Sequence, residues 1–299
     1  MSKSTILFPI LCLLFVWTNF VCALNYDGEL DEVVGGTTVL KGAHKYKALI
    51  LKTKGGETTL CGGTVISENH ILTSASCVDA KPYDKLQVVM RVYTIVPMDS
   101  TRIIRYVLDK DIQIHKDYNK MTRVNDIAIL RMNSTVDLTL IAKVTLPPEV
   151  ARSPSYAGTT GIATGWGLTL SNGTTVARSM QQVSLQIKDK STCEAIHDNY
   201  DDTLQLCTYT TGKSICLGDY GGPILVGGVQ VGISSYVKVF NGKPACERGA
   251  VFTRVSTYVN NGWIVENMLN GDEINPIVIP TEPTVATTAM PATTKAATL

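Results

Sequence analysis

The stretch Cys216–Pro223, which reads CLGDYGGP, has the composition of a turn that presents a nucleophile. Glycines on both sides allow a tight backbone turn, and Asp219 precedes the central position, where a serine hydroxyl would be the expected nucleophile. That central position is Tyr220, and a phenol has a reference pKa near 10. Catalysis at this turn therefore requires a base elsewhere in the chain that removes the phenolic proton.

The spacing of the histidines and cysteines does not suggest a metal site. Four histidines are scattered along the chain, namely His44, His70, His115 and His197. The cysteines form no CxxC pair, so neither zinc nor any other metal or cofactor is expected. Cys12 and Cys22 lie within residues 1–23, and the other cysteines form an even set that predicts three disulfide bonds in an exported protein: Cys61, Cys77, Cys193, Cys207, Cys216 and Cys246.

Residues 1–23 have the order of a secretory signal peptide. Lys3 is followed by the apolar run ILFPILCLLFVW, and FVCA offers small or neutral residues for cleavage after Ala23. A transmembrane anchor is the weaker alternative because the run is short and contains Pro9. We therefore predict a secreted, extracellular protein in which residues 24–32 form a short N-terminal extension.

Residues 271–299 differ in composition from the rest of the chain. They are rich in Thr, Pro and Ala and contain no aromatic residue, so they cannot bury enough surface to order themselves. We predict a disordered tail, either O-glycosylated like a short mucin or unmodified. Asn133 in NST and Asn172 in NGT are candidate N-glycosylation sites if both lie on loops.

Between residues 33 and 270, short β-branched runs alternate with glycine-rich or polar turns. Examples are YKALILKT, LQVVMRVYTIV, DIAILRM and AVFTRV. Many short strands with turns between them are typical of an all-β sandwich or barrel.

The segment STYVNNGWIVENMLNG predicts a C-terminal α-helix. Ser256 or Thr257 could cap it, and one apolar face would contain Val259, Trp263 and Met268 or Leu269. Gly262 inside such a helix costs about 1 kcal/mol relative to Ala.

The charge of the chain excludes some classes of partner. The formal net charge is +1, which provides no global field for nucleic acid or for an acidic surface. We expect no nucleic-acid partner and no membrane partner, and a chain of this kind is expected to be a monomer.

Six motifs occur in one order at plausible intervals, and together they resemble the chymotrypsin/trypsin family of serine proteases. They are VVGG from Val33, CGGTVIS from Cys61, LTSASC ending at Cys77, NDIAIL around Asp126, TGWG ending at Gly167 and GDYGGP ending at Pro223. The resemblance covers about residues 33–269. It implies two six-stranded antiparallel β-barrels with a C-terminal α-helix. It also implies the disulfide bonds Cys61–Cys77, Cys193–Cys207 and Cys216–Cys246.

The resemblance assigns three catalytic positions, and two of them carry residues that do not suit the chemistry. The base of the family is a histidine immediately before the cysteine of the motif that reads LTSASC here, and that position is Ser76. A serine has no pKa near neutrality and cannot act as a general base. The carboxylate position is Asp126, for which we expect a structural role in hydrogen bonds to the backbone or to Ser76. The nucleophile position is Tyr220, which lacks an activating base.

The activation residues also depart from the family pattern. Family members are usually cut before the VVGG-like motif, and the new amino group pairs with the aspartate that corresponds to Asp219. Here Glu32 precedes Val33 in place of the usual Arg or Lys. We expect a single chain in which Asp219 is paired otherwise or partly solvated.

The resemblance likewise implies a small or closed substrate pocket. Ser214 stands where trypsin-like members carry an aspartate at the base of the pocket, and Ser235 matches the family serine. Val237 and Ala250 replace two wall glycines, so their side chains occupy volume that a substrate side chain would fill.

These residues favour a secreted, catalytically inactive serine protease homolog that acts by binding protein. The expected partner is another protein, either an active protease or one of its substrates. The alternative is an active serine-type endopeptidase with an atypical site. A third hypothesis, a lectin-like or inhibitor-like module that binds a ligand in the old cleft, has no supporting group of residues.

Overall fold

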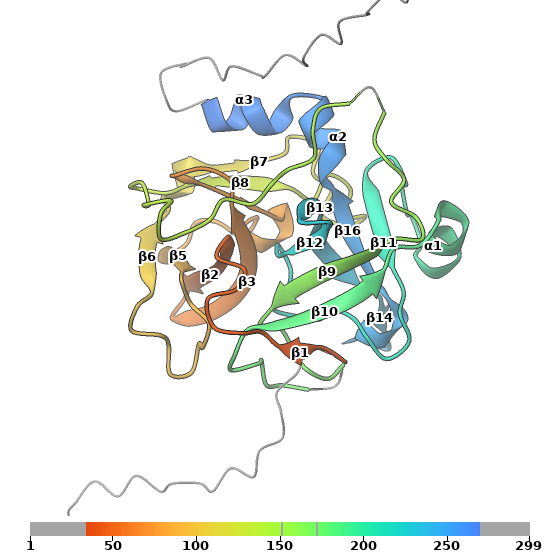
Figure 1. Cartoon of the computed structure of the whole chain (residues 1–299), viewed down its shortest axis with the longest axis horizontal. Coiled ribbons are helices and arrows are strands. Elements are labelled where there is room, and N and C mark those ends of the chain that lie inside the picture. Colours follow the sequence, from red (N-terminus) through yellow and green to blue (C-terminus); the bar gives the residue numbers. More distant parts are fainter. Residues whose placement is uncertain (1–33, 151, 172, 270–299) are drawn as a thin grey trace, which may run out of the picture. The chain divides into compact units, whose positions relative to one another are not determined.

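The structure is a computed structural model that describes residues 34–150, 152–171 and 173–269 (Figure 1). The predicted signal peptide, the N-terminal extension, Glu32, Val33, Asn172 and the predicted tail lie outside the described residues. Predictions about them therefore stay predictions.

The first antiparallel sheet has seven strands in the order β6-β5-β2-β3-β4-β8-β7. Its strands are β2 (Lys47–Lys54), β3 (Glu57–Val65), β4 (His70–Thr73), β5 (Lys85–Met90), β6 (Ile103–Tyr106), β7 (Ile112–Ile114) and β8 (Ala128–Arg131). Two short 3₁₀ helices, η1 (Ala75–Cys77) and η2 (Asp109–Asp111), connect them. Because β-branched and apolar residues suit a pleated buried surface, runs such as KALIL form these strands.

The second antiparallel sheet has seven strands in the order β1-β10-β9-β12-β13-β16-β11. Its strands are β1 (Thr37–Thr38), β9 (Thr160–Gly165), β10 (Gln181–Gln186), β11 (Gln205–Thr208), β12 (Pro223–Val226), β13 (Val229–Val237) and β16 (Ala250–Arg254). Helix α1 (Lys190–Ile196), the 3₁₀ helix η3 (Cys246–Arg248) and the small hairpin of β14 (Val239–Phe240) and β15 (Lys243–Pro244) lie beside it.

The predicted all-β class with two antiparallel β-barrels is confirmed, although each sheet contains seven strands rather than six. The short strand β1 accounts for one additional strand, because Thr37 and Thr38 pair with Gln182 and Gln181 of β10. The N-terminal segment thus joins the second sheet before the chain enters the first one.

The core is divided among the two sheets and the region where they meet. Each sheet has its own cluster of buried side chains, centred on residues such as Ile50 and Val88 in one and Leu185 and Phe252 in the other. A third cluster contains residues of both sheets and of the C-terminal helices. This packing fixes the two sheets against each other along the line on which the candidate site lies.

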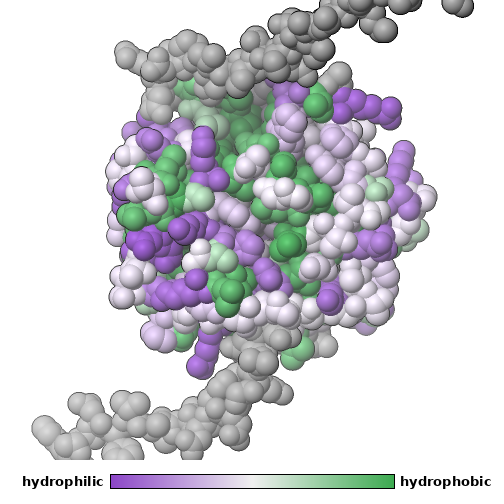
Figure 2. All heavy atoms as spheres, viewed as in Figure 1, coloured by the Kyte–Doolittle hydropathy of each residue, from purple (hydrophilic) through white to green (hydrophobic). Residues whose placement is uncertain are grey.

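The surface of the described part of the chain is mixed in character. Figure 2 shows hydrophobic residues gathered toward the middle of one face, with hydrophilic residues between and around them. Apolar side chains at a protein surface are common in themselves, so only those that border a cavity bear on function.

The C-terminal helix is present, but it is divided into α2 (Val255–Asn260) and α3 (Trp263–Leu269). Gly262 adopts φ +78°, the left-handed conformation that ends a helix, and its N–H donates to the carbonyl of Val259. The prediction of a cap at Ser256 or Thr257 is wrong, because the helix begins after Arg254 without a side-chain cap. Val259, Trp263 and Met268 do pack against one core cluster.

The three predicted disulfide bonds are confirmed. Cys61 of β3 is bonded to Cys77 of η1, and Cys193 of α1 is bonded to Cys207 of β11. The third bond joins Cys216 to Cys246 and so ties the CLGDYGGP turn to η3. Among the described residues, no helix has the length and apolar character that a bilayer crossing requires.

Candidate functional site

A buried carboxylate, Asp126, collects hydrogen bonds from two other elements. Ser76 of η1 donates twice, from its backbone N–H to Oδ1 at 2.6 Å and from its hydroxyl to Oδ2 at 2.9 Å. The hydroxyl of Ser235, in β13, donates to Oδ2 at 2.5 Å. The backbone carbonyl of Asp126 accepts a hydrogen bond from the Thr253 hydroxyl of β16. Residues of η1 and of the second sheet therefore hold Asp126 in place.

The environment of Asp126 determines its protonation. Burial raises the pKa of this carboxyl above its ordinary value, while the hydrogen bonds from Ser235 and Ser76 oppose that rise. The Arg123 guanidinium lies 4.0 Å from Oδ2 and favours the ionised form in the same way. The Ser76 hydroxyl meets the carboxylate at the position that the resemblance assigns to an imidazole, and it lies 3.2 Å from the hydroxyl of Ser74.

Tyr220 lies between the two sheets. Its ring packs against the core clusters of both, and its hydroxyl accepts a hydrogen bond from the Val237 N–H at 3.4 Å. Burial raises the pKa of this phenol to about 12. The backbone around it is fixed as well, since the Tyr220 carbonyl accepts a hydrogen bond from the Gly62 N–H at 2.7 Å.

A hollow of about 400 Å³ adjoins Tyr220. Its walls come from the segment before Asp126, from the end of α1 and from the end of β13, and include Met121, Arg123, His197, Leu217, Tyr236, Val237 and Val239. The wall thus combines aromatic and aliphatic side chains with charged ones, namely Arg123 and the ion pair of Lys238 with Asp198.

His197 is a wall residue that sequence reasoning did not place at the site. Its ring is buried and meets Tyr236 edge-on, with the ring centroids 5.9 Å apart. Neither ring nitrogen has a hydrogen-bond partner among the described residues. Burial lowers the pKa of His197 to about 4, so the imidazole is neutral at pH 7. The signal in the sequence is weak, because only the fold brings α1 next to the turn.

The other three histidines are engaged elsewhere. His44 contacts the Tyr46 hydroxyl at 2.8 Å and Gln182 at 3.0 Å. His70 lies 2.8 Å from the Ser67 hydroxyl, and His115 packs against Tyr258 and Trp263. These contacts connect the three imidazoles to residues other than those at the candidate catalytic positions.

The residues assigned to the substrate pocket are buried. Ser214, Ser235 and Ala250 have no exposed surface, and Val237 is 3% exposed. Val237 of β13 and Ala250 of β16 are paired in register. The two side chains that replace the expected wall glycines therefore lie on neighbouring strands. Of these four residues, Val237 alone lines the hollow beside Tyr220.

Asp219 is held inside the protein. Its carboxylate accepts hydrogen bonds from the Gly167 N–H at 2.8 Å and the Cys216 N–H at 3.0 Å, and the residue is 1% exposed. Burial raises the pKa of Asp219, although the Lys47 ammonium acts in the opposite direction. Of the two predicted arrangements, the geometry shows a paired carboxylate and not a solvated one.

Lys47 is a second residue that sequence reasoning missed. It is buried on β2, and its Nζ has no hydrogen-bond partner in the described part of the chain. Burial lowers the pKa of Lys47 to about 8, and Asp219 limits that decrease. Its ammonium lies 5.8 Å from the centre of the Trp166 ring and beside the backbone of Gly222. The sequence shows a lysine inside the apolar run YKALIL, but spacing alone does not show that it is buried.

Of the two candidate glycosylation sites, Asn133 is described and is exposed. Its side-chain oxygen accepts a hydrogen bond from the Tyr106 N–H at 3.0 Å, which leaves the amide nitrogen available. Within the described residues, no three His, Cys, Asp or Glu side chains are grouped as ligands for a metal ion.

The two β-barrels, the disulfide-tied turn of residues 216–222 and the buried aspartate at their junction define a chymotrypsin-like serine protease fold. Comparison with known proteins agrees with this class. The sequence model of the Trypsin family matches residues 33–264, and the chain belongs to this family.

Relatives and solved structures extend the comparison. Chymotrypsin-2 of Vespa crabro is 33% identical over 241 residues, which are 79% of this chain and all of that protein. Brachyurin of Leptuca pugilator is 31% identical and covers 78% of this chain and 96% of its own length. The solved structure of GrC has a TM-score of 0.69 at 25% identity, and the match covers 79% of this chain and 99% of that one.

Proposed function

We propose that this chain is a secreted, catalytically inactive member of the trypsin family that acts by binding another protein. The observation that carries the proposal is the hydrogen bonding of Asp126. Its carboxylate oxygens accept from the Ser76 N–H and from the hydroxyls of Ser76 and Ser235, where a protease needs an imidazole to receive a proton.

The chemistry of Ser76 and Tyr220 supports the absence of hydrolysis. A serine hydroxyl cannot accept a proton at neutral pH, and the Tyr220 phenol, with a pKa of about 12, stays protonated. The ring also occupies space between the sheets that a substrate carbonyl would need. Removing the serine or the histidine of a catalytic triad lowers turnover on the order of 10⁶-fold in subtilisin, and here both positions are changed.

The environment of Asp219 supports a function that needs no cleavage before Val33. In the family, a new amino terminus supplies the positive charge next to this aspartate. Here Lys47 supplies a positive charge from within β2, and two backbone N–H groups satisfy the carboxylate. These contacts support an arrangement in which the turn of residues 216–222 is held without a new amino terminus.

Exposed apolar side chains around the hollow support a protein partner. Met121 is 91% exposed, Val239 63%, Phe240 52% and Leu217 40%. Three of them, Met121, Leu217 and Val239, line the hollow beside Tyr220. Apolar groups of this kind, bordered by polar residues, are typical of protein-binding sites. The favoured occupant is an apolar segment of an active protease or of its substrate.

A fluorophosphonate probe tests the loss of catalysis, because it labels only activated serines. We expect no labelling of the full secreted chain, and none of a Ser76→His/Tyr220→Ser double variant, since Val237 still narrows the pocket. Labelling of the wild-type chain at one serine would refute inactivity. Peptide hydrolysis by the double variant would show that the two triad changes alone abolish activity.

An active endopeptidase with an atypical site remains the alternative, and His197 is the feature that such a mechanism could use. Its neutral imidazole lies on the wall of the hollow that Tyr220 borders. If peptide hydrolysis is observed and His197→Gln abolishes it, this alternative replaces the proposal.

A capture experiment from the native secretion tests the binding role. Wild-type protein and a Val265→Asp control, which alters an exposed apolar residue on α3, are expected to retain the same partner. Val239→Asp is expected to lose the partner, because a carboxylate on the wall of the hollow beside Tyr220 opposes apolar contact. If all three proteins retain the partner equally, binding at the hollow beside Tyr220 is refuted.

A further inference from the structure

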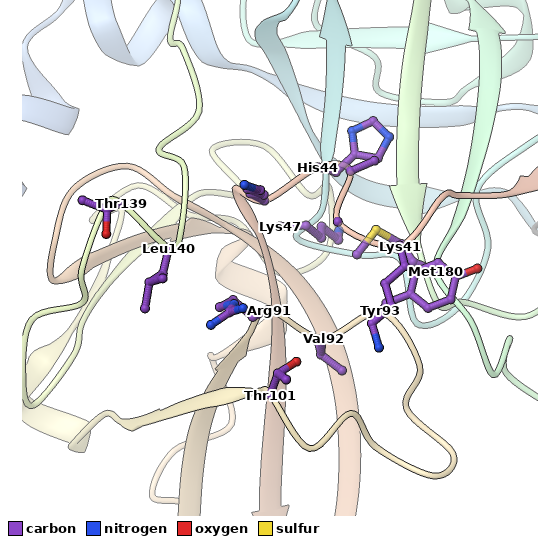
Figure 3. A pocket seen from close by; sticks show the side chains of 13 residues that line it. Lys41, His44, Lys47, Arg91, Val92, Tyr93, Thr101, Thr139, Leu140 and Met180 are labelled. Carbon is purple, nitrogen blue, oxygen red and sulfur yellow. The ribbon is translucent and has the colours of Figure 1, made fainter.

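A second cavity, of about 190 Å³, lies apart from the hollow beside Tyr220, and the two have no wall residue in common. Three segments and Met180 form it; the segments lie within residues 41–47 at the entry to β2, residues 91–101 between β5 and β6, and residues 139–140 (Figure 3). In Figure 3 the Arg91 side chain lies between those of Leu140 and Val92. Lys41, Tyr93 and Met180 lie beyond Val92 in this view. Segments far apart in the sequence thus border one surface pocket.

The walls of this cavity carry cations and no carboxylate. Lys41, Lys45, Lys47 and Arg91 line it, and no Asp or Glu is among the wall residues. Lys41 is paired with Asp99 at 2.8 Å, outside the wall. In the described part of the chain, the side chains of Lys45 and Arg91 have no ion pair or hydrogen bond. Two exposed cations at one cavity therefore have no counterion from the described part of the protein.

The backbone at Arg91 provides an independent observation. Arg91 has φ +53°, in the left-handed region where glycine is the favoured residue. His44, also on the wall, has φ +49°, and its ring is fixed by Tyr46 and Gln182. Strained non-glycine residues concentrate at functional sites. An arginine here places a guanidinium at the cavity at a cost that glycine would avoid.

We propose that this cavity binds a sulfate or phosphate group. The Arg91 guanidinium offers paired N–H donors that match such oxyanions, and Lys45 adds a second unneutralised charge. The hydroxyls of Thr101 and Thr139 supply neutral donors on the wall, while Val92, Leu140 and Met180 provide apolar surface for an attached organic group. The volume is below the usual range for drug-sized ligands, which suits one anionic group.

Isothermal titration of the full secreted chain tests the proposal. The probes are sodium sulfate, sodium phosphate and phenyl phosphate, each at constant ionic strength against sodium chloride. We expect saturable one-site binding in the millimolar range or tighter. Tighter binding of phenyl phosphate indicates that the group is recognised as an ester, whereas equal or weaker binding indicates a free anion.

Arg91→Gly separates binding from folding. Glycine accepts φ +53° without strain, so the variant is expected to unfold at the same temperature as the wild type or higher. Its affinity for the anion is expected to fall at least tenfold, while Lys190→Gln, a charge-matched change on α1, leaves the affinity unchanged. Absence of saturable binding, or equal affinity of Arg91→Gly and wild type, would overturn the proposal. Neither result bears on catalysis at Tyr220.

Discussion

At the scale of single residues, Lys47 and Asp219 are two buried charged groups that influence each other, because each alters the pKa of the other. A Cβ on Gly222 would collide with the Lys47 ammonium, and one on Gly167 would collide with the Asp219 carboxylate. Gly222 and Gly167 therefore leave the room that the Lys47 and Asp219 side chains occupy.

A double-mutant cycle measures the coupling between these two charges. Lys47→Met leaves the Asp219 carboxylate buried without a nearby cation, so we expect a loss of about 3 kcal/mol in the free energy of unfolding. The same change in an Asp219→Asn background is expected to cost at least about 1 kcal/mol less. Urea denaturation of the four proteins at pH 7 gives the values. Additive losses would show that Lys47 and Asp219 do not interact.

At the scale of secondary structure, the sequence predicted strands better than it predicted the C-terminal helix. The run YKALILKT covers residues 46–53, and β2 spans Lys47–Lys54. The helical pattern of residues 256–271 was also real, but it fits a continuous helix and a broken one equally well. Whether Gly262 adopts a left-handed conformation depends on how α2 and α3 pack on the core, which periodicity does not report.

Substitution of Gly262 tests whether the break depends on the left-handed backbone. Gly262→Ala is expected to cost about 1 kcal/mol through strain at φ +78°, since a Cβ there has no close neighbour. Gly262→Asn should cost less, because asparagine tolerates this conformation better. Thermal unfolding of both variants gives the comparison. A stability gain in Gly262→Ala would mean that the residue can return to a continuous helix.

The candidate site divides in the same way between predictable and unpredictable parts. The resemblance carried by six motifs located Ser76, Asp126 and Tyr220, and the fold brings the first two into direct contact. Lys47 and His197 could not be located, because their importance comes from burial against residues distant in the sequence. A buried polar side chain within a strand or short helix has no signature in spacing alone.

At the scale of the whole molecule, stability depends on pH through buried groups that act in opposite directions. His197 has a folded pKa of about 4, below the ordinary value of 6.5, so the unfolded chain binds a proton first as the pH falls. Above pH 6.5 the neutral imidazole does not lower the free energy of unfolding. Between pH 6.5 and 4, protonation of the unfolded chain lowers it progressively. The raised pKa values of Asp126 and Asp219 act oppositely, because protonation there favours the folded chain.

His197→Phe isolates the histidine contribution. The phenyl ring keeps the edge contact with Tyr236 and cannot be protonated, while Lys238 and Asp198 remain beside it. Relative to this variant, the wild type is expected to lose up to about 3 kcal/mol of unfolding free energy between pH 7 and pH 4. Denaturant titrations at several pH values measure the difference. Parallel pH profiles for the two proteins would contradict the assignment.

The pairing of β1 with β10 has a consequence for how the chain is completed during synthesis. Thr38 and its hydrogen-bond partner Gln181 are 143 residues apart, and the whole first sheet lies between them. The first strand to leave the ribosome is thus unable to pair until the second sheet has begun to emerge. Strands β2 to β8 can assemble during that interval, since their partners lie among themselves. Strand β1 therefore waits unpaired while the first sheet is made, and it can join the second sheet once β10 is available.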